Sequence, residues 1–238
     1  MEQNLIPSNP AAEVDPPKFI GAPMKVLTEA QLDTFMTAIE RDEFWHDFFY
    51  TAVTTGLRRG EIRALRWEDF DTKQETLHVR RTLHKENGKP LTTGDTKTYA
   101  GTRKIVLPPS TAQLLRERKK TAPTEWIFPN LFDPEQPISP GTAYNRLKVL
   151  LKEAGLPDIR FHDLRHTFAT HALSSGVDAK TLAGILGHTK ASFTLDAYTH
   201  TTGDMQKRAA EIVGGFLTDY LGEEMKPWQS SENTAPSV

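Results

Sequence analysis

The spacing of apolar residues changes twice along the chain, and these changes restrict the fold more than any other feature. Near the start, Leu32, Phe35, Met36 and Ile39 follow the period of an amphipathic helix. From 77 to 83 apolar and polar residues alternate, which is typical of a half-buried strand, and helical spacing returns after residue 109. The pattern predicts an α+β fold, mainly helical, with one small antiparallel sheet inserted among the helices.

Capping and breaking residues predict where the elements begin and end. Thr28 and Gln31 fit a capping box, Gly56 ends a second helix that begins near Phe44, and a third helix holds Ile62 and Leu65. Asn87-Gly88 predicts a turn before a further strand at 103–107. Later helix starts are predicted at Ser110 (with Gln113), Ser139-Pro140, Asp163 and Asp178, and later helix ends at Gly155, Gly176 and Gly187.

Composition excludes several classes of protein. The 238 residues include no cysteine, which rules out a disulfide scaffold and thiolate chemistry. No apolar run approaches the roughly 20 residues of a membrane helix, and residues 1–10 lack the basic and apolar regions of a signal peptide. We expect a cytoplasmic protein with no membrane partner.

Charge is distributed unevenly. The chain has a net charge of −2, but residues 1–45 carry −5, residues 219–238 carry −3, and the middle carries +6. A basic middle permits a phosphate-binding face that the whole-chain charge hides. An ordinary surface with uneven tails explains the same numbers equally well.

The segment Thr55-Gly56-Leu57-Arg58-Arg59-Gly60-Glu61 offers the first candidate for chemistry. A glycine before paired arginines lets the chain turn sharply and present a guanidinium, which binds a phosphate through two parallel hydrogen bonds. The competing interpretation is a solvated helix turn with Arg59, Arg63 and Arg66 on its face. Taken alone, this segment favours the second interpretation.

The segment His162-Asp163-Leu164-Arg165-His166 is the second candidate. His162 and Arg165 share a helical face, so an imidazole and a guanidinium can converge on one ligand. His162 and His166 also have the spacing of the zinc motif H-E-x-x-H, which would suggest a metal-dependent hydrolase. Asp163 is one methylene shorter than the catalytic Glu of that motif, and no third ligand follows at a familiar spacing. A structural role is expected for His166 and His171.

The third candidate joins Leu186-Gly187-His188 to Tyr198, ten residues later in Asp196-Ala197-Tyr198-Thr199-His200. A lone tyrosine is more often a core residue than a nucleophile. A tyrosine that attacks phosphate needs fixed cations nearby, because its phenol is a weak nucleophile near neutral pH. The two arginines and two histidines of these segments would supply them.

In this order, TGLRRGE, HDLRH and LGH followed by AYTH resemble the catalytic domain of the tyrosine recombinases, or phage integrase family, over roughly residues 27–200. The segment LGHTKASFTLDAYTH is most similar to integrases of conjugative transposons and temperate phages. The ordered set is far more specific than any one motif. The resemblance implies a site-specific DNA recombinase that acts on double-stranded DNA without metal, cofactor or small-molecule substrate.

The resemblance also implies a role for each matching residue. Arg58 and Arg165 would grip the scissile phosphate, and His162 and His188 would hydrogen-bond it and assist proton transfer. Tyr198 would attack, forming a 3′-phosphotyrosine and a free 5′-hydroxyl. Lys97 fits best as the lysine that protonates the leaving oxygen, ahead of Lys104 and Lys89.

The family usually has an additional N-terminal DNA-binding domain, which implies a division of this chain into four parts. Residues 1–24 resemble the linker after that domain, so the chain is expected to be the catalytic part of a longer product. Residues 25–203 would form the catalytic domain and 222–238 a disordered tail. Residues 204–221 would form a C-terminal helix that either packs against its own domain or passes to a neighbouring protomer of a tetramer on DNA. The main alternative is a DNA-binding remnant that modulates a full-length recombinase.

Overall fold

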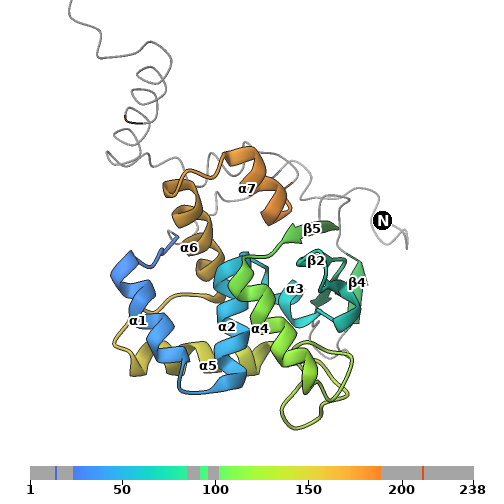
Figure 1. The fold of residues 1–238 in the computed structure, drawn as a ribbon. Helices are drawn as coiled ribbons and strands as arrows, with labels where there is room; N and C mark the ends of the chain where they lie inside the picture. Colours follow the sequence, from blue (N-terminus) through green and yellow to red (C-terminus); the bar gives the residue numbers. More distant parts are fainter. Residues whose placement is uncertain (1–13, 15–23, 85–91, 96–101, 189–210, 212–238) are drawn as a thin grey trace, which may run out of the picture.

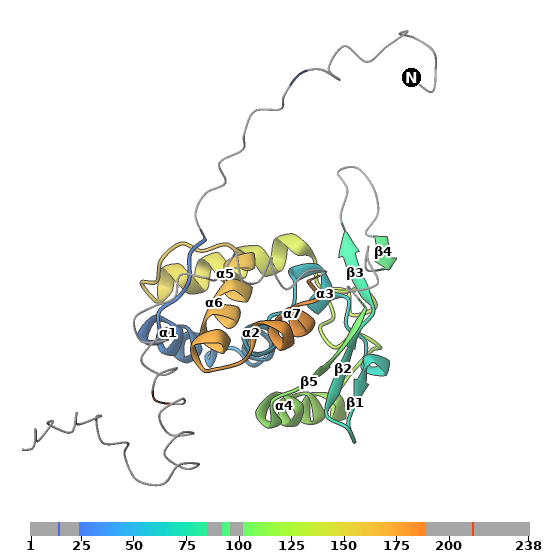
Figure 2. The same cartoon turned by 90° about the horizontal axis from the view of Figure 1, so that it is seen from above.

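The computed structural model describes residues 14, 24–84, 92–95, 102–188 and 211. Helices form most of the described chain, and antiparallel strands lie at one side of them (Figures 1 and 2). The described helices include none long and apolar enough to span a membrane. The α+β class expected from the sequence is confirmed.

Along the chain, one group of helices precedes the strands and a second group follows them. The helices are α1 (Glu29–Ile39), α2 (Glu43–Thr55), α3 (Arg59–Arg63), the 3-10 turn η1 (Trp67–Asp69), α4 (Pro109–Lys120), α5 (Pro140–Glu153), α6 (Phe161–Ser174) and α7 (Ala179–Leu186). The strands are β1 (Phe70–Asp71), β2 (Thr76–Val79), β3 (Arg81–His84), β4 (Thr92–Asp95) and β5 (Arg103–Val106).

Most predicted helix ends are confirmed. Thr28 and Gln31 form a capping box, and the side chains of Ser139 and Asp178 cap α5 and α7. Gly56 and Gly187 end α2 and α7 in the left-handed conformation, at φ values of 62° and 68°.

Three helix boundaries differ from the prediction. Helix α4 begins at Pro109 after the N-cap Pro108, so Ser110 lies inside the helix; a proline at the first position has the required φ and no N–H to satisfy. Helix α3 ends before Leu65. Helix α6 begins at Phe161, two residues before the predicted start, because the Asp163 carboxylate accepts the Arg160 N–H at 2.8 Å and closes the first turn from inside the helix.

The predicted alternating strand is divided between two antiparallel pairings. Strand β2 lies between β1 and β5, whereas β3 pairs with β4, and Arg80 separates β2 from β3. The register places Val79 opposite Arg103, the first residue of β5. The predicted turn at Asn87-Gly88 lies outside the described residues.

Helix α2 is the centre of the core. Its residues Phe48 and Phe49 are fully buried and contact aromatic side chains of α1, α6 and the segment after α4, including Phe35, Phe161 and Phe128. A smaller apolar cluster, formed by Ala169, Leu182 and Leu186, packs α7 onto α6. The packing of α6 and α7 brings the ends of α2 and α7 together.

Gly56 lies where those helix ends meet, and its replacement tests how tightly they pack. A Cβ added there would lie 2.4 Å from Phe168 Cδ1, on α6. Gly155 is a matched control because it has a similar left-handed φ of 64° and no atom within 4 Å of an added Cβ.

We expect Gly155→Ala to lower the free energy of unfolding by about 1 kcal/mol through backbone strain alone. Gly56→Ala should lose about 1–3 kcal/mol more because the neighbouring side chains must shift. Urea unfolding of both variants measures the difference, and equal losses would contradict this account of the packing.

Candidate active site

Arg58 lies at the N-cap of α3, directly after the turn that ends α2. Its backbone N–H donates to Glu61 Oε2 at 2.9 Å and its Nη1 to Glu61 Oε1 at 2.8 Å, so the buried glutamate fixes both backbone and guanidinium. Its Nη2 donates to the Gly187 carbonyl at 3.3 Å. The side chain keeps 38% of its surface exposed and can therefore still contact a ligand.

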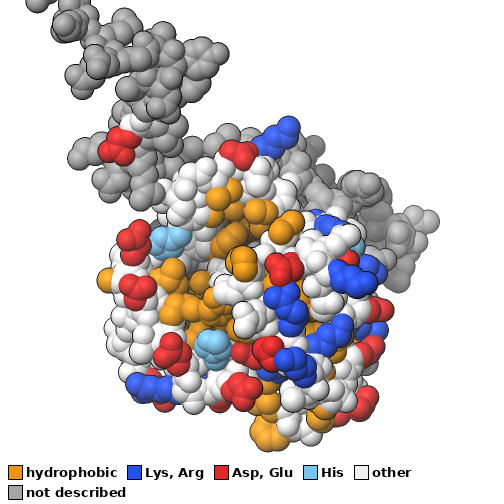
Figure 3. Space-filling view, viewed as in Figure 1, with side chains coloured by type: hydrophobic (Ala, Val, Ile, Leu, Met, Phe, Trp, Pro, Cys, Tyr) orange, Lys and Arg blue, Asp and Glu red, His pale blue; other side chains and the backbone are white. Residues whose placement is uncertain are grey.

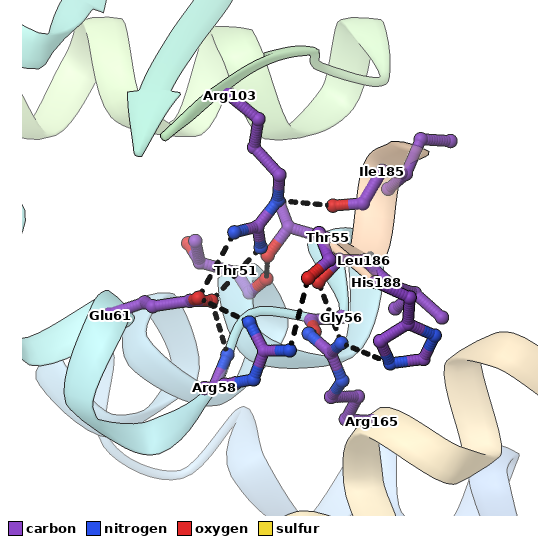
Figure 4. A network of polar contacts seen from close by, with 11 residues as sticks. Thr51, Thr55, Gly56, Arg58, Glu61, Arg103, Arg165, Ile185, Leu186 and His188 are labelled. Carbon is purple, nitrogen blue, oxygen red and sulfur yellow. Dashed lines mark hydrogen bonds and ion pairs between the residues drawn. The ribbon is translucent and has the colours of Figure 1, made fainter. Parts of the chain in front are cut away.

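Arg165 is buried on α6 and binds the ends of both α2 and α7 (Figure 4). Its Nη1 donates to the Gly56 carbonyl at 2.9 Å, and its Nη2 donates to the Leu186 carbonyl at 2.6 Å. The same Nη2 lies 2.8 Å from His188 Nε2. Two arginines separated by 107 positions thus meet at one place.

Two histidines complete this cluster. His162 is solvent-accessible, one turn before Arg165 on α6, and its ring lies edge-to-face with His166 at 4.5 Å between centroids. Partial burial, then the charges of Arg165 and Arg58, lower the pKa of His162. The same causes lower the pKa of His188 to about 4. The charges of both arginines therefore act on both imidazoles, and they disfavour the cationic histidines that the sequence-based interpretation expected.

Sequence reasoning missed Arg103 as part of this network. From β5, its Nη1 and Nη2 donate to the two carboxylate oxygens of Glu61 at 3.0 and 2.9 Å. Burial would raise the pKa of Glu61, but the hydrogen bond and charge of Arg103, followed by those of Arg58, lower it to about 2. Glu61 is thus a fixed anion between two arginines. Arg103 lies 42 positions after Glu61 in the sequence, and no local sequence motif predicts a contact over that separation.

The alternative prediction was a solvated helix turn that carries Arg59, Arg63 and Arg66. It is wrong for Arg63. Arg63 is only 2% exposed, and its Nε donates to the Ile138 carbonyl at 2.6 Å. Arg59 is exposed and Arg66 is half-buried. The side of α3 that carries Ile62 and Arg63 faces the core, which a five-residue helix is too short to reveal by periodicity.

The structure describes four of the six predicted catalytic residues and brings them together: Arg58, His162, Arg165 and His188. Lys97 and Tyr198 lie outside the described residues, as do Lys89 and all of the predicted C-terminal helix except Glu211. Lys104 is described. Its Nζ donates to Gln74 Oε1 at 2.8 Å, and its side chain leaves β5 on the opposite face from Arg103, because successive residues of a strand alternate.

Two other side chains of α6, Asp163 and His171, make structural contacts. The Asp163 carboxylate binds the Arg160 guanidinium and backbone, and the His171 Nε2 lies 2.8 Å from the Leu27 carbonyl. Among the described residues, no group of three or more His, Cys, Asp and Glu side chains is placed to hold a metal ion.

Comparisons with known proteins identify relatives of this chain. A tyrosine recombinase XerC-like protein from Caldanaerobacter subterraneus subsp. tengcongensis is 31% identical over 71% of this chain and 49% of its own length. The ICEBs1 integrase of Bacillus subtilis is 28% identical over 91% of this chain and 61% of its own length. The chain thus spans about half to three-fifths of these relatives.

The fold is shared with solved structures. The Tn1549 transposon integrase in complex with circular intermediate DNA superposes with a TM-score of 0.71 and 25% identity, over 82% of this chain and 68% of that one. The XerA recombinase superposes with a TM-score of 0.63. The model of the phage integrase family matches residues 25–204. Since that match covers most of the chain and contains all four clustered residues, the chain belongs to the phage integrase family.

Proposed function

We propose that this chain is the catalytic domain of a tyrosine recombinase that cleaves and rejoins double-stranded DNA. The observation that carries the proposal is the convergence of Arg58, Arg165, His162 and His188 from three separate segments. Guanidinium and imidazole groups gathered at one point suit a phosphodiester, whose non-bridging oxygens accept several charge-assisted hydrogen bonds. The family relationship and the DNA complex of the Tn1549 integrase support DNA as the ligand.

The proposed reaction has two displacement steps. In the first, Tyr198 Oη attacks the phosphorus, the bond to the 5′-oxygen breaks, and a 3′-phosphotyrosine forms. A histidine takes the phenolic proton, and Lys97 gives a proton to the leaving 5′-oxygen. In the second step a 5′-hydroxyl attacks the phosphotyrosine and releases Tyr198. Each step exchanges one phosphodiester for another, so no nucleotide is consumed.

The surface beside the cluster supports a path for the DNA backbone. A pocket next to Arg58 is also lined by Arg59, Tyr144, Arg160 and His162. On the face shown in Figure 3, Lys and Arg side chains gather toward the strands but are interspersed with acidic ones. We therefore assign the phosphate grip to the arginine cluster and its pocket rather than to the general charge of that face.

The proposal includes the wider organisation expected from the sequence. Residues 1–24 would connect to a separate DNA-binding domain, and residues 25–203 would form the catalytic domain. A helix at 204–221 would pass to the neighbouring protomer of a tetramer on DNA, followed by a tail at 222–238. The proposal also keeps the cytoplasm as the compartment in which the protein would act on DNA. The alternative remains a remnant that binds DNA without cleaving it and modulates a full-length recombinase.

The first prediction concerns the nucleophile. Tyr198→Phe should abolish the covalent protein–DNA adduct on a nicked suicide substrate and leave DNA affinity nearly unchanged, because only one hydroxyl is lost. Denaturing gels measure the adduct with and without EDTA. An adduct that persists in the variant removes Tyr198 from its role. Binding without any wild-type adduct or cleavage favours the remnant. Adduct-free cleavage that is lost in EDTA and recovers on added zinc or magnesium favours the hydrolase.

The second prediction compares neighbouring arginines. Arg58→Ala should slow adduct formation at saturating DNA about 10²–10³-fold, the usual effect of removing one fixed donor from a developing anion. The exposed Arg59 is the matched control. Arg59→Ala should weaken DNA binding and lower its salt dependence by about one ion, with little change in the saturated rate. Equal rate losses in the two variants would contradict the assignment.

The third prediction concerns pH and the free protein. Burial first, then neighbouring charges, lower the folded-state pKa of His166 and His188 to about 4, from the ordinary 6.5. Between these values the unfolded chain binds more protons than the folded one, so acidification destabilises the fold.

We expect the melting temperature to fall as the pH is lowered from about 6.5 toward 5, a range chosen to lie above most carboxylate titrations. Thermal unfolding at several pH values measures this slope, and His166→Gln should flatten it. A melting temperature that stays constant from pH 6.5 to 5 would contradict the burial of neutral histidines.

A further inference from the structure

Three consecutive carbonyl groups at the C-terminal end of α7 each bind a different arginine. The Ile185 carbonyl accepts from Arg103 Nε at 2.5 Å, the Leu186 carbonyl accepts from Arg165 Nη2, and the Gly187 carbonyl accepts from Arg58 Nη2. Carbonyls in the last turn of a helix lack intrahelical partners and carry partial negative charge. They hold cations from β5, α6 and α3 directly before His188 (Figure 4).

Arg103 differs from the other two arginines because it also controls an anion. Its side chain is 7% exposed, and its guanidinium binds both carboxylate oxygens of Glu61. Glu61 in turn holds the backbone and side chain of Arg58. A buried carboxylate with only one remaining cation would be poorly compensated. The orientation of Arg58 therefore depends on Arg103 through one shared carboxylate.

Arg103 also lies at a structural junction. It is the first residue of β5 and follows Lys97 by six positions in the sequence. Its contacts with Glu61 and with the Ile185 carbonyl connect the start of this strand to α3 and to the end of α7. Arg103 lies outside the proposed phosphate-binding group, but it binds Glu61 and the Ile185 carbonyl, which hold that group in place.

We propose that Arg103 is a positioning residue for DNA cleavage. It acts on Arg58 through Glu61 and on His188 through the end of α7. This inference rests on the proposed recombinase function for its kinetic consequence, but its geometric consequence can be measured without DNA.

The experiment compares Arg103→Met with a matched variant elsewhere. Arg118 has the same kind of environment away from the cluster: its Nη1 donates to Asp47 Oδ2 at 3.0 Å and its Nε to the Ile127 carbonyl at 2.9 Å. Arg118→Met removes a comparable partly buried ion pair and controls for general loss of stability.

At saturating nicked DNA, Arg103→Met should slow adduct formation about tenfold to a hundredfold, as small misplacements of catalytic groups do. Its DNA affinity should change much less. Arg118→Met should keep the wild-type rate, and Arg103→Lys should recover part of it. Adding Arg103→Met to Glu61→Gln should slow the reaction little further, because both changes break one linkage. Wild-type rates in Arg103→Met, equal slowing in Arg118→Met, or additive effects would overturn the proposal.

A second measurement keeps the two proposals separate. Nitrogen-15 NMR of the DNA-free protein should show shifted side-chain signals of Arg58 and His188 in Arg103→Met and unshifted ones in Arg118→Met. Unshifted signals in Arg103→Met overturn the positioning role, whatever the cleavage result. If the wild-type protein forms no adduct while the Arg103→Met variant shows these shifts, the recombinase function is refuted and the positioning role stays supported.

Discussion

The site depends on the hydrogen bonds that the buried carboxylate of Glu61 accepts from two arginines. In the described network it faces Arg58 and Arg103, while Arg165 binds the neighbouring carbonyls of Gly56 and Leu186. Three guanidinium groups and one carboxylate leave an excess of positive charge in a partly buried place. Helix ends and their carbonyls offset part of that excess. A phosphodiester would supply the missing negative charge, which is how a folded site becomes preorganised for a transition state rich in anionic oxygens.

The lowered pKa values of the histidines follow first from burial and then from the same excess charge. In the free protein, His188 has a pKa of about 4 and is therefore a neutral imidazole near neutral pH. A bound phosphate would favour its protonated form, because an anion counteracts the nearby guanidinium charges. Under the proposed mechanism the histidines thus become able to take a proton when the substrate arrives.

Features of the fold and the site that depend on neighbouring residues could be predicted from the sequence, whereas contacts between distant segments could not. The helix ends at Gly56 and Gly187 were predicted because glycine readily adopts the left-handed conformation that ends a helix. The ordered motifs named Arg58, His162, Arg165 and His188, which the structure brings together. The contact of Arg103 with Glu61 was not predicted because it joins distant segments of the chain. The burial of Arg63 was missed for a similar reason: its partner is the Ile138 carbonyl, 75 positions away. Arg80 divides a run whose alternation looked continuous.

The proposed chemistry requires Arg58 and Arg165 to neutralise one scissile phosphate. The most direct measurement replaces a non-bridging oxygen of that phosphate with a methyl group, which removes its negative charge and leaves the reacting bonds in place. The account predicts that Arg165→Ala, severely slowed on the ordinary phosphate, regains much of its cleavage rate on the neutral substrate, because the charge it would have balanced is gone. An Arg165→Ala variant that is slowed equally on both substrates would contradict the claim.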